Sequence, residues 1–217
     1  MNQELFSKVD DYISNLFGTN TEILESARKL IEQEGIPQIS VSPNQGKMLF
    51  ILAKLCGVNK ILEIGTLGGY STIWMASALP KNGKLITLEL EPKHAEVAQK
   101  NIDHSGLHDK VEIKIGKALE SLKQINDKFD MIFIDADKPP YMKYFEEALR
   151  LSHPGTLIIA DNVVRDGKVI EPNKEDEEIV GISRFNDMLA KCKDVEAIIV
   201  PTVGEKGYDG MAISVVK

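Results

Sequence analysis

Two carboxylates and an amide follow two apolar segments of the chain, at the points where each segment would end as a strand. Asp135 follows the expected strand 129–134, which is apolar except for Asp130. Asp161 and Asn162 follow the apolar residues 156–160. Ligands of open α/β sheets bind outside the carboxyl ends of the strands, so these three side chains are expected to meet in one crevice. Oxygen ligands without sulfur or imidazole favour Mg²⁺ or Ca²⁺ over Zn²⁺; Mg²⁺ is the expected ion, and Mn²⁺ is a further alternative.

A local role is the alternative for each of these residues. Asp137 and Asn162 could be turn formers, and Asp161 could cap the next element. For one residue alone the local role is favoured, but the combined pattern at two strand ends favours a metal site. Asp137 is left out of the metal set because it alternates away from Asp135. Three protein ligands would leave about three octahedral positions for water and substrate oxygens.

A glycine-rich turn lies between an expected strand at 60–64 and an expected helix at 70–79. It reads Glu63-Ile64-Gly65-Thr66-Leu67-Gly68-Gly69-Tyr70-Ser71, and its glycines allow the backbone to turn sharply and approach a ligand. The dinucleotide pattern G-x-G-x-x-G, counted from Gly65, fails at Leu67 and Tyr70, so the diphosphate-specific arrangement is missing. A helix amino terminus still favours a carboxylate.

Glu89 lies at the end of the next expected strand, at 84–90. An acidic residue in this position accepts hydrogen bonds from ribose hydroxyls in nucleotide-binding sheets. Alone, Glu89 would be interpreted as a solvated carboxylate; with the glycine turn upstream, nucleoside binding is favoured. The four histidines lie away from the expected strand ends and are interpreted as solvated or capping residues: His94, His104, His108 and His153.

The pattern along the chain predicts the elements that position these residues. Apolar residues recur at helical spacing over 5–17, 22–34 and 46–55. The third of these helices is preceded by an N-cap and first-turn proline, Ser42–Pro43. After residue 60 the pattern changes to alternating strands and helices. The further helices are expected at 70–79, 92–104, 118–122, 141–151 and 179–191, and the strands at 60–64, 84–90, 111–115, 129–134, 156–160, 195–200 and 211–216. Seven strands with intervening helices predict a doubly wound, mostly parallel sheet of Rossmann-like α/β type.

The last two expected strands are joined by residues 201–210 without a helix. A connection that short suits an antiparallel pair, so the seventh strand is expected to be the one antiparallel member. No linker separates the amino-terminal helices from the sheet. The chain is therefore expected to form a single domain over residues 1–217, with a helical extension at 1–57 and a cofactor-binding sheet core at 58–217.

The composition is that of an ordinary globular protein. The chain has 217 residues, 43% of them hydrophobic, with 26 Lys and Arg against 33 Asp and Glu, a net charge of −7. This excludes wholesale disorder and argues against a dedicated nucleic-acid binder, which would carry a basic field. Residues 1–9 are polar and no apolar run is long enough to span a membrane, so a soluble, cytoplasmic protein is expected. Cys56 and Cys192 are expected to be buried or partly buried free thiols.

Three motifs together resemble the cation-dependent, S-adenosylmethionine-dependent O-methyltransferases, the group of the caffeoyl-CoA and catechol O-methyltransferases and their small bacterial members. The motifs are the glycine turn at 63–71, Asp135-Ala136-Asp137-Lys138 and Asp161-Asn162-Val163, and the resemblance runs from about Val41 to the carboxyl terminus. It implies a seven-strand methyltransferase fold and methyl transfer from S-adenosylmethionine to a phenolic hydroxyl. The ending at 203–210 resembles the bacterial members more than the mammalian catechol enzyme.

The resemblance also implies roles for individual residues. Residues matching Asp135, Asp161 and Asn162 hold the divalent metal, the lysine matching Lys138 is the general base, and the residue matching Glu89 binds the adenosyl ribose. The further residues that it places in the cofactor site are Val41, Glu63, Gly65, Thr66, Ser71, Ala118 and Asp135. It also implies a homodimer, with the amino-terminal helices as the contact.

These residue types suit the implied chemistry. A phenol titrates near pH 10, and a metal that binds the phenolic oxygens stabilises the anion and orients both hydroxyls. Lys138 beside that cation can take the proton of the attacking hydroxyl, its alternative being a solvated surface lysine. The expected acceptor is a small vicinal dihydroxyphenyl compound. Residues 165–178 are interpreted either as a solvated connection or as a flap over the acceptor pocket, which Tyr208 could border.

Three other functions are weighed against this one. A methyltransferase of tRNA or another nucleic acid is disfavoured by the acidic balance. A nucleotide-dependent oxidoreductase is disfavoured by the broken dinucleotide pattern. A non-catalytic cofactor-binding protein is disfavoured by the intact metal set and by Lys138.

Overall fold

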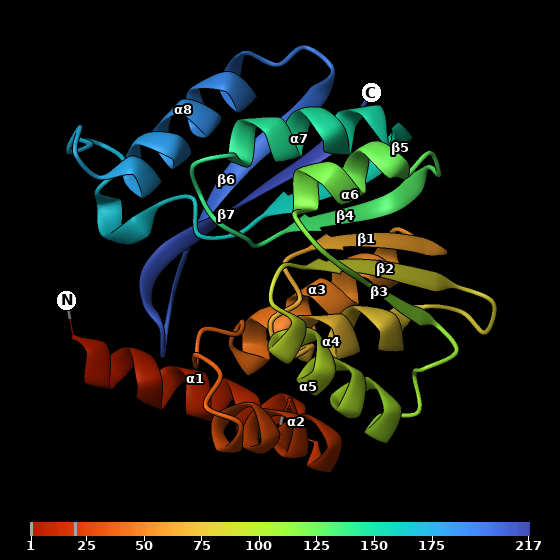
Figure 1. Ribbon diagram of the computed structural model, residues 1–217. Coiled ribbons are helices and arrows are strands. Elements are labelled where there is room, and N and C mark those ends of the chain that lie inside the picture. Colours follow the sequence, from red (N-terminus) through yellow and green to blue (C-terminus); the bar gives the residue numbers. More distant parts are fainter. Residues whose placement is uncertain (1, 20) are drawn as a thin grey trace.

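The computed structural model describes residues 2–19 and 21–217, and at its centre is a sheet with strand order β3-β2-β1-β4-β5-β7-β6 (Figure 1). The strands are β1 (Lys60–Ile64), β2 (Lys84–Glu89), β3 (Val111–Ile115), β4 (Phe129–Ile134), β5 (Ser152–Ala160), β6 (Val195–Gly204) and β7 (Gly207–Val216). Neighbouring strands among β1 to β5 pair in parallel, whereas β7 pairs antiparallel with both β5 and β6. The doubly wound sheet with an antiparallel seventh strand is thus confirmed.

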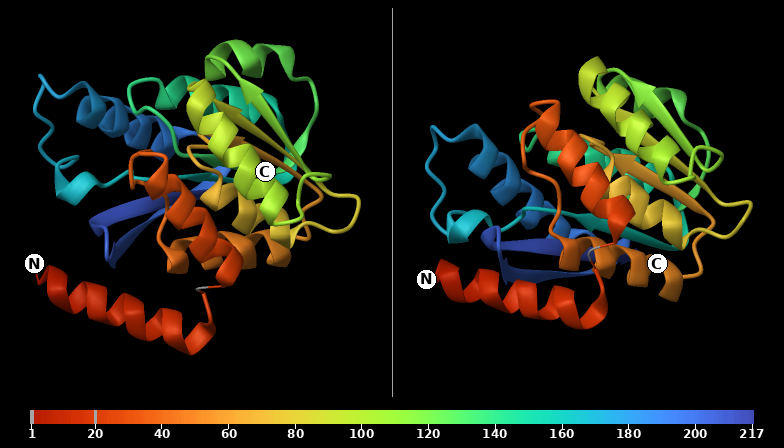
Figure 2. Two further views of the ribbon diagram at one scale, coloured as in Figure 1. Left: turned by 60° about the horizontal axis from the view of Figure 1, so that its bottom comes forward. Right: turned by 90° about the horizontal axis from the view of Figure 1, so that it is seen from below.

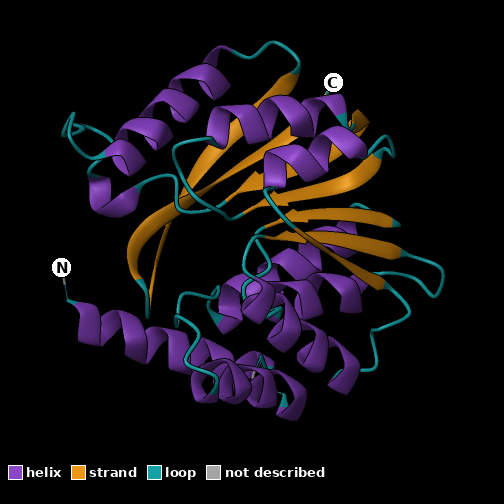
Figure 3. Cartoon of the chain, in the orientation of Figure 1, coloured by secondary structure: helices purple, strands orange, loops and turns teal. Residues whose placement is uncertain are grey.

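Helices cover both faces of this sheet (Figure 3). One face carries α2 (Glu22–Gln33), α3 (Pro43–Leu55), α4 (Tyr70–Ala78) and α5 (Pro92–His104). The other face carries α6 (Ala118–Gln124), α7 (Tyr141–Arg150) and α8 (Glu177–Lys191). The first helix, α1 (Gln3–Phe17), lies outside these layers, next to β6 and α3 (Figure 2).

The central strands are buried on both faces. In β4, Met131 and Phe133 pack into the hydrophobic cluster of α2, α3 and α4, and Ile132 and Ile134 pack into the cluster of α6, α7 and α8. All four residues have 0% exposure. Burial on both sides explains why residues 131–134 are a continuous apolar run, and Asp135, directly after them, is again partly exposed.

The amino-terminal helices pack directly against the layer that carries the glycine turn. The Ser42 hydroxyl accepts a hydrogen bond from the Gln45 amide at 3.2 Å, and the Gln45 side chain accepts one from the Ser42 amide at 2.9 Å, which fixes the start of α3. A Cβ at Gly46 would overlap the Trp74 ring, and one at Gly68 would overlap Ile31. Helices α3 and α2 therefore approach α4 and the glycine turn at contact distance.

The connection at 201–210 has no helix and joins an antiparallel pair, as expected, but the strand bounds 195–200 and 211–216 are too short, because β6 and β7 continue through it as a hairpin. Their pairing runs without interruption from Val195 opposite Val216 to Gly204 opposite Gly207. Pro201, which has no amide hydrogen, is tolerated because β6 is an edge strand. The tip of the hairpin extends beyond the sheet toward α1 (Figure 1).

Other boundaries differ by a few residues. β5 begins at Ser152 instead of 156, with a register shift opposite β4. The charged segment 165–178 contains a short 3-10 turn (Arg165–Gly167), and its last two residues are already in α8, whose amino terminus is capped by the Asp176 side chain. Only the part between these two elements is a loop.

Both cysteines are free thiols, as expected. Cys192 is partly buried, but Cys56 is exposed, so the expectation of a buried or partly buried thiol is wrong at that position. The reason is that Cys56 lies at the end of α3 beside the exposed Leu55, and the chain returns to the core only at Val58, after the left-handed Gly57. Within the described residues, no helix has both the length and the apolar character needed to cross a membrane.

Candidate active site

Strands β1 and β4 lie side by side, and the candidate site is built where their carboxyl ends meet. The backbone ladder continues past the strands: the Asp135 amide donates to the Ile64 carbonyl and the Asp161 amide to the Ile134 carbonyl, each at 2.9 Å. Gly65 has a φ of +100°, and a Cβ there would overlap the Asp135 carbonyl. Only glycine allows the turn after β1 to approach Asp135 this closely.

Glu89 holds the glycine turn in place. Its Oε2 accepts hydrogen bonds from the amides of Thr66 (3.2 Å) and Leu67 (2.8 Å), and its Oε1 accepts one from the amide of Glu91 (2.9 Å). Leu67 itself has a left-handed φ of +49°. The residue expected to meet the ribose therefore lies in the crevice and also shapes the turn beneath it.

His94 lies next to Glu89, with Nδ1 3.5 Å from Oε1. The sequence interpretation assigned this histidine a solvated or capping role and missed the contact. The signal was its place in the first turn of α5, which begins directly after β2 and so returns past the strand end. His94 is the one histidine of the described residues whose ion-pair partner is a candidate site residue.

Glu63 is fully buried and binds the side chains that follow the glycine turn. Its two carboxylate oxygens accept hydrogen bonds from the Ser71 hydroxyl at 2.6 Å and the Thr72 hydroxyl at 2.5 Å. Burial raises its pKa to about 7, against the lowering effect of these hydrogen bonds. Glu63 thus positions Ser71 from below the turn.

The other expected cofactor residues border the same turn or the next strand end. The Thr66 hydroxyl lies 2.5 Å from the Thr87 hydroxyl. Val41 is buried in the hydrophobic cluster of α2, α3 and α4, directly before α3. Ala118 begins α6, and the Gly116 amide just before it donates to the Glu89 carbonyl at 2.8 Å, which brings this turn beside Glu89.

Asp135 follows β4 and Asp161 and Asn162 follow β5, and we call this part of the site the oxygen-rich side of the crevice. Asp161 is 2% exposed, and its Oδ1 accepts a hydrogen bond from the Asn162 amide at 2.8 Å. Burial raises the pKa of Asp161 to about 8, and the negative charge of Asp135 adds to the shift. Asn162 has a left-handed φ of +58°, a conformation that Asn tolerates better than most residues.

This donor set fits a divalent cation. A buried carboxylate beside a second carboxylate is unfavourable unless a positive charge compensates it. The described residues contain no group of three His, Cys, Asp or Glu side chains arranged for a metal ion, so a three-ligand set here would have to include the amide oxygen of Asn162. Hard oxygen donors of this kind suit Mg²⁺.

Lys138 points into the same crevice and is only 6% exposed. Its ammonium nitrogen lies 3.3 Å from Asp135 Oδ1, 2.5 Å from the Tyr141 hydroxyl and 3.4 Å from the Asp161 carbonyl. The alternative interpretation of Lys138 as a solvated surface lysine is thus wrong. Tyr141 was missed in the sequence. It is the first residue of α7, and its amide donates to the Lys138 carbonyl at 3.2 Å, so the turn before the helix brings the two side chains together.

Asp209 supports the loop that follows Asn162. Its Oδ1 accepts hydrogen bonds from the amides of Val164 (3.0 Å) and Arg165 (2.9 Å). Arg165 and Asp166 both have left-handed φ angles, +52° and +57°. Hairpin residue Asp209 therefore fixes a strained loop beside the oxygen-rich side of the crevice.

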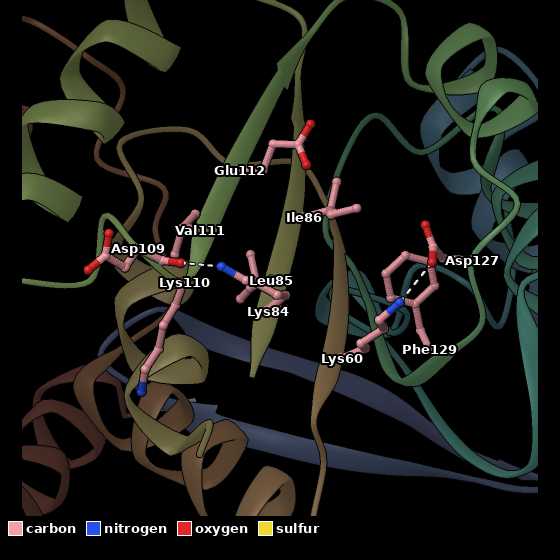
Figure 4. Close-up of a pocket in the computed structure, with 10 residues that line it drawn as sticks. All are labelled: Lys60, Lys84, Leu85, Ile86, Asp109, Lys110, Val111, Glu112, Asp127 and Phe129. Atoms are coloured by element: carbon pink, nitrogen blue, oxygen red, sulfur yellow. Dashed lines mark hydrogen bonds and ion pairs between the residues drawn. The ribbon is translucent and has the colours of Figure 1, made fainter. Parts of the chain in front are cut away.

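A separate cavity of about 310 Å³ lies at the opposite, amino-terminal edge of β1 and β2 (Figure 4). Two of its lysines already have partners: Lys60 pairs with the Asp127 side chain at 2.7 Å, and Lys84 donates to the Asp109 backbone carbonyl at 2.5 Å. Ligands of such sheets bind at the carboxyl ends of the strands. This cavity is therefore not a candidate for the active site.

A glycine turn at the switch in strand order, with an acidic residue after the next strand, defines an α/β protein that binds a nucleoside-containing ligand. The sequence model of the O-methyltransferase family matches residues 14–214. A catechol O-methyltransferase from Niastella koreensis is 58% identical over 221 aligned residues that cover 100% of both chains. This chain belongs to the O-methyltransferase family.

Solved structures agree with this assignment. An O-methyltransferase from Bacillus cereus, in complex with SAH, has a TM-score of 0.97 and 46% identity and covers 99% of this chain and 100% of its own. One from Streptomyces achromogenes, in complex with SAM, has a TM-score of 0.96 and 42% identity, with coverages of 100% and 99%. The protein is a S-adenosylmethionine-dependent O-methyltransferase, which removes the oxidoreductase and the non-catalytic protein as alternatives.

Proposed function

We propose that this protein transfers the methyl group of S-adenosylmethionine to one hydroxyl of a small vicinal dihydroxyphenyl compound, with the help of a divalent cation. The observation that carries the proposal is the meeting of Asp135, Asp161 and Lys138 at the strand ends next to the glycine turn. The name of the relative from Niastella koreensis, a catechol O-methyltransferase, supports an acceptor of this type.

The cofactor would lie over the glycine turn. Glu89 can accept hydrogen bonds from the ribose hydroxyls, because its carboxylate already lies at the mouth of the turn. Ser71, held by Glu63, and the amino terminus of α4 can bind the carboxylate of the methionine portion. Val41, Gly65, Thr66, Ala118 and Asp135 are the remaining residues that we assign to this site.

Asp135, Asp161 and Asn162 would hold the cation, with Mg²⁺ as the preferred ion. When bound, the cation stabilises the ionised acceptor and holds its two oxygens. Burial of Asp161 supports this assignment, since a bound cation would stabilise the ionised carboxylate that burial and the charge of Asp135 disfavour.

Lys138 is the proposed general base. Its Nζ can accept the proton of the attacking hydroxyl once it is neutral, and the Tyr141 hydroxyl and the Asp161 carbonyl hold this nitrogen at the crevice. The acceptor oxygen then attacks the methyl carbon, and the bond from that carbon to sulfur breaks. Orientation of the two groups by the protein supplies much of the rate enhancement.

We further propose one domain and a homodimer. The shared hydrophobic cluster of α2, α3, α4 and the sheet supports a single domain over residues 1–217. An apolar stripe on the outer side of α1 supports self-association: Leu5, Val9, Tyr12 and Leu16 are 46–64% exposed and recur at helical spacing. The loop 168–176 is a candidate flap over the acceptor, with Tyr208 on the adjoining hairpin.

The proposed function is tested by a methyl-transfer screen over phenolic acceptors, with Mg²⁺ and with EDTA. We expect transfer to dihydroxy compounds in Mg²⁺ and its loss in EDTA. A protein that methylated bulk tRNA instead, or that ignored EDTA, would contradict the proposal.

A further inference from the structure

The tip of the β6–β7 hairpin is held in a fixed place. The Gln3 side chain donates to the carbonyls of Gly204 (3.0 Å) and Glu205 (2.9 Å). The Glu205 amide donates to Asp10 Oδ2 at 2.6 Å, and the Glu205 carboxylate lies 3.7 Å from the Arg28 guanidinium. The tip is thus joined to both α1 and α2, as its approach to α1 in Figure 1 suggests.

This fixed tip lies between the two sides of the active-site crevice. On one side, the Lys206 ammonium donates to the carbonyl of Ser40, the residue before Val41. On the other side, Asp209 holds the loop after Asn162 through two backbone amides. Lys206 therefore connects the cofactor side of the crevice to the hairpin that supports the oxygen-rich side.

The charge of Lys206 interacts with the carboxylates of the crevice. Burial lowers the pKa of Lys206, and the carboxylates of Asp135 and Asp161 act in the opposite direction. Charges interact over about 10 Å at ordinary ionic strength, and Lys206 lies on the hairpin whose Asp209 binds the loop directly after Asn162, so its ammonium could act on a molecule bound at these carboxylates.

Lys206 differs from the other cations around the crevice in its partner. Lys138 pairs with Asp135, Arg28 with Glu205, and Arg165 with Glu178. Among the described residues, the hydrogen-bond acceptor of Lys206 is the neutral Ser40 carbonyl. An ammonium has three donors, so Lys206 can bind a carboxylate of a ligand without leaving Ser40.

We propose that Lys206 is a specificity-determining residue that selects acceptors carrying a carboxylate on the side of the ring away from the two hydroxyls. This inference rests on the proposed function, which puts the hydroxyls at Asp135 and Asp161. A carboxylate at the far end of a ring held in this way would lie toward the hairpin tip that carries Lys206. Arginine at the same position should preserve the selection, and a neutral residue should abolish it.

Lys206 could instead act only by holding the hairpin against Ser40. Loss of such a structural contact would lower kcat/KM for all acceptors equally, whereas loss of a charge contact would lower it only for the anionic ones. The ratio of two kcat/KM values, for an anionic and a neutral acceptor, separates the two roles, because any general loss from a loosened hairpin cancels in it.

The experiment uses 3,4-dihydroxybenzoate and 3,4-dihydroxybenzamide, which share the two hydroxyls and differ in charge. Initial rates are measured for the full-length protein at saturating S-adenosylmethionine and Mg²⁺, in wild type, K206Q, K206R and K60Q. K60Q removes the same charge from the opposite edge of the sheet, where Lys60 pairs with Asp127. The free energy of one hydrogen bond to a charged group corresponds to a ratio of about tenfold or more between the kcat/KM values of the benzoate and the benzamide.

We expect wild type, K206R and K60Q to prefer the benzoate by about tenfold, and K206Q to lose this preference through a higher KM for the benzoate. The wild-type preference should also fall as NaCl is raised. Equal losses for both acceptors in K206Q, or no preference in wild type, would overturn the inference while leaving the proposed function intact. Methylation of neither acceptor by wild type would overturn the proposed function itself, and the inference with it.

Discussion

The ammonium nitrogen of Lys138 lies 3.3 Å from Oδ1 of Asp135, so the proposed base is paired with a proposed metal ligand. A cation bound at Asp135 would withdraw that carboxylate from Lys138 and would place a positive charge beside the ammonium. Both effects favour loss of a proton from Lys138. Cation binding and the availability of the base are therefore expected to be coupled.

Replacement of this base tests the coupling. Lys138→Met is expected to lower kcat by about 10²–10⁴-fold and to move the pH optimum upward, because hydroxide must then remove the proton. Steady-state rates from pH 6 to 10 measure both effects. Lys143→Met, an exposed lysine on α7, is the matched control. An unchanged pH–rate profile in the Lys138 variant would remove it from the reaction.

Asp161 links the cation to folding stability. Burial raises the pKa of Asp161 from 3.8 to about 8 in the cation-free protein, so the ionised carboxylate is less favourable in the folded than in the unfolded chain. Its contribution to stability is therefore most favourable below pH 3.8 and is lost as the pH rises toward about 8. Asp161→Asn is expected to raise the Tm of the cation-free protein at pH 8.

The same variant should lose the response to metal. Mg²⁺ stabilises wild type by binding the folded state, and Asp161→Asn removes one of the proposed ligands. Thermal unfolding in EDTA and in Mg²⁺ measures this directly. Asp137→Asn, whose carboxylate instead accepts from the Tyr144 hydroxyl, should respond as wild type does. An equal Mg²⁺ shift in the Asp161 variant would show that the ion binds elsewhere.

Glu89 should contribute to cofactor affinity in two ways, through the ribose and through the glycine turn. Glu89→Gln is expected to weaken S-adenosylmethionine binding by about 1–3 kcal/mol, the range for the loss of hydrogen bonds to a charged group. Isothermal titration calorimetry gives the value. Glu91→Gln, at an exposed carboxylate two residues away, serves as the control. Unchanged affinity in the Glu89 variant would remove it from the ribose site.

A pH-dependent contact far from the active site gives a further prediction. His153 places Nδ1 2.9 Å from the Pro154 carbonyl and Nε2 2.9 Å from Asp130 Oδ1, and these two contacts raise its pKa. Both ring nitrogens face acceptors, so the charged form is favoured. The resulting stability is fully present below about pH 6.5 and is lost as the pH rises through the raised pKa.

Urea unfolding of wild type and His153→Gln between pH 5 and 8 measures this contribution. The difference between the two proteins is expected to be small, because the side chain is 42% exposed, and to shrink toward pH 8. His108→Gln is the control, at a histidine whose side chain is 59% exposed. A difference that grew with pH would contradict the assignment.

Much of the fold could be predicted from the sequence because its signals are local. The apolar run 131–134 indicates a buried strand, and the glycines after Ile64 indicate a sharp turn. Because both residues follow expected strands, Asp135 and Asp161 were predicted to lie at the carboxyl-terminal edge of the sheet, and they lie there in the structure. The hairpin at 201–210 could not be predicted so easily, since Pro201 argues against a strand until the strand is known to be an edge.

The contacts that the sequence did not reveal are between residues far apart in the chain. Lys206 and Ser40 are 166 positions apart, and Asp209 and Val164 are 45 apart. His94 belongs to the same class, because its role depends on how α5 folds back past Glu89. Such pairs are set by the packing of whole elements, which periodicity and motif spacing do not encode.

The most direct test of the proposed function compares kcat/KM for matched acceptors that differ by one hydroxyl. Two adjacent hydroxyls can bind one cation together and a single hydroxyl cannot, so the second hydroxyl should determine the orientation of the acceptor. At saturating S-adenosylmethionine and Mg²⁺, 3,4-dihydroxybenzoate is expected to react at least about 10²-fold faster than 4-hydroxybenzoate or 3-hydroxybenzoate, a gap of roughly 2.7 kcal/mol. Equal kcat/KM values for the dihydroxy compound and its monohydroxy partners would contradict cation-assisted transfer to a vicinal diol.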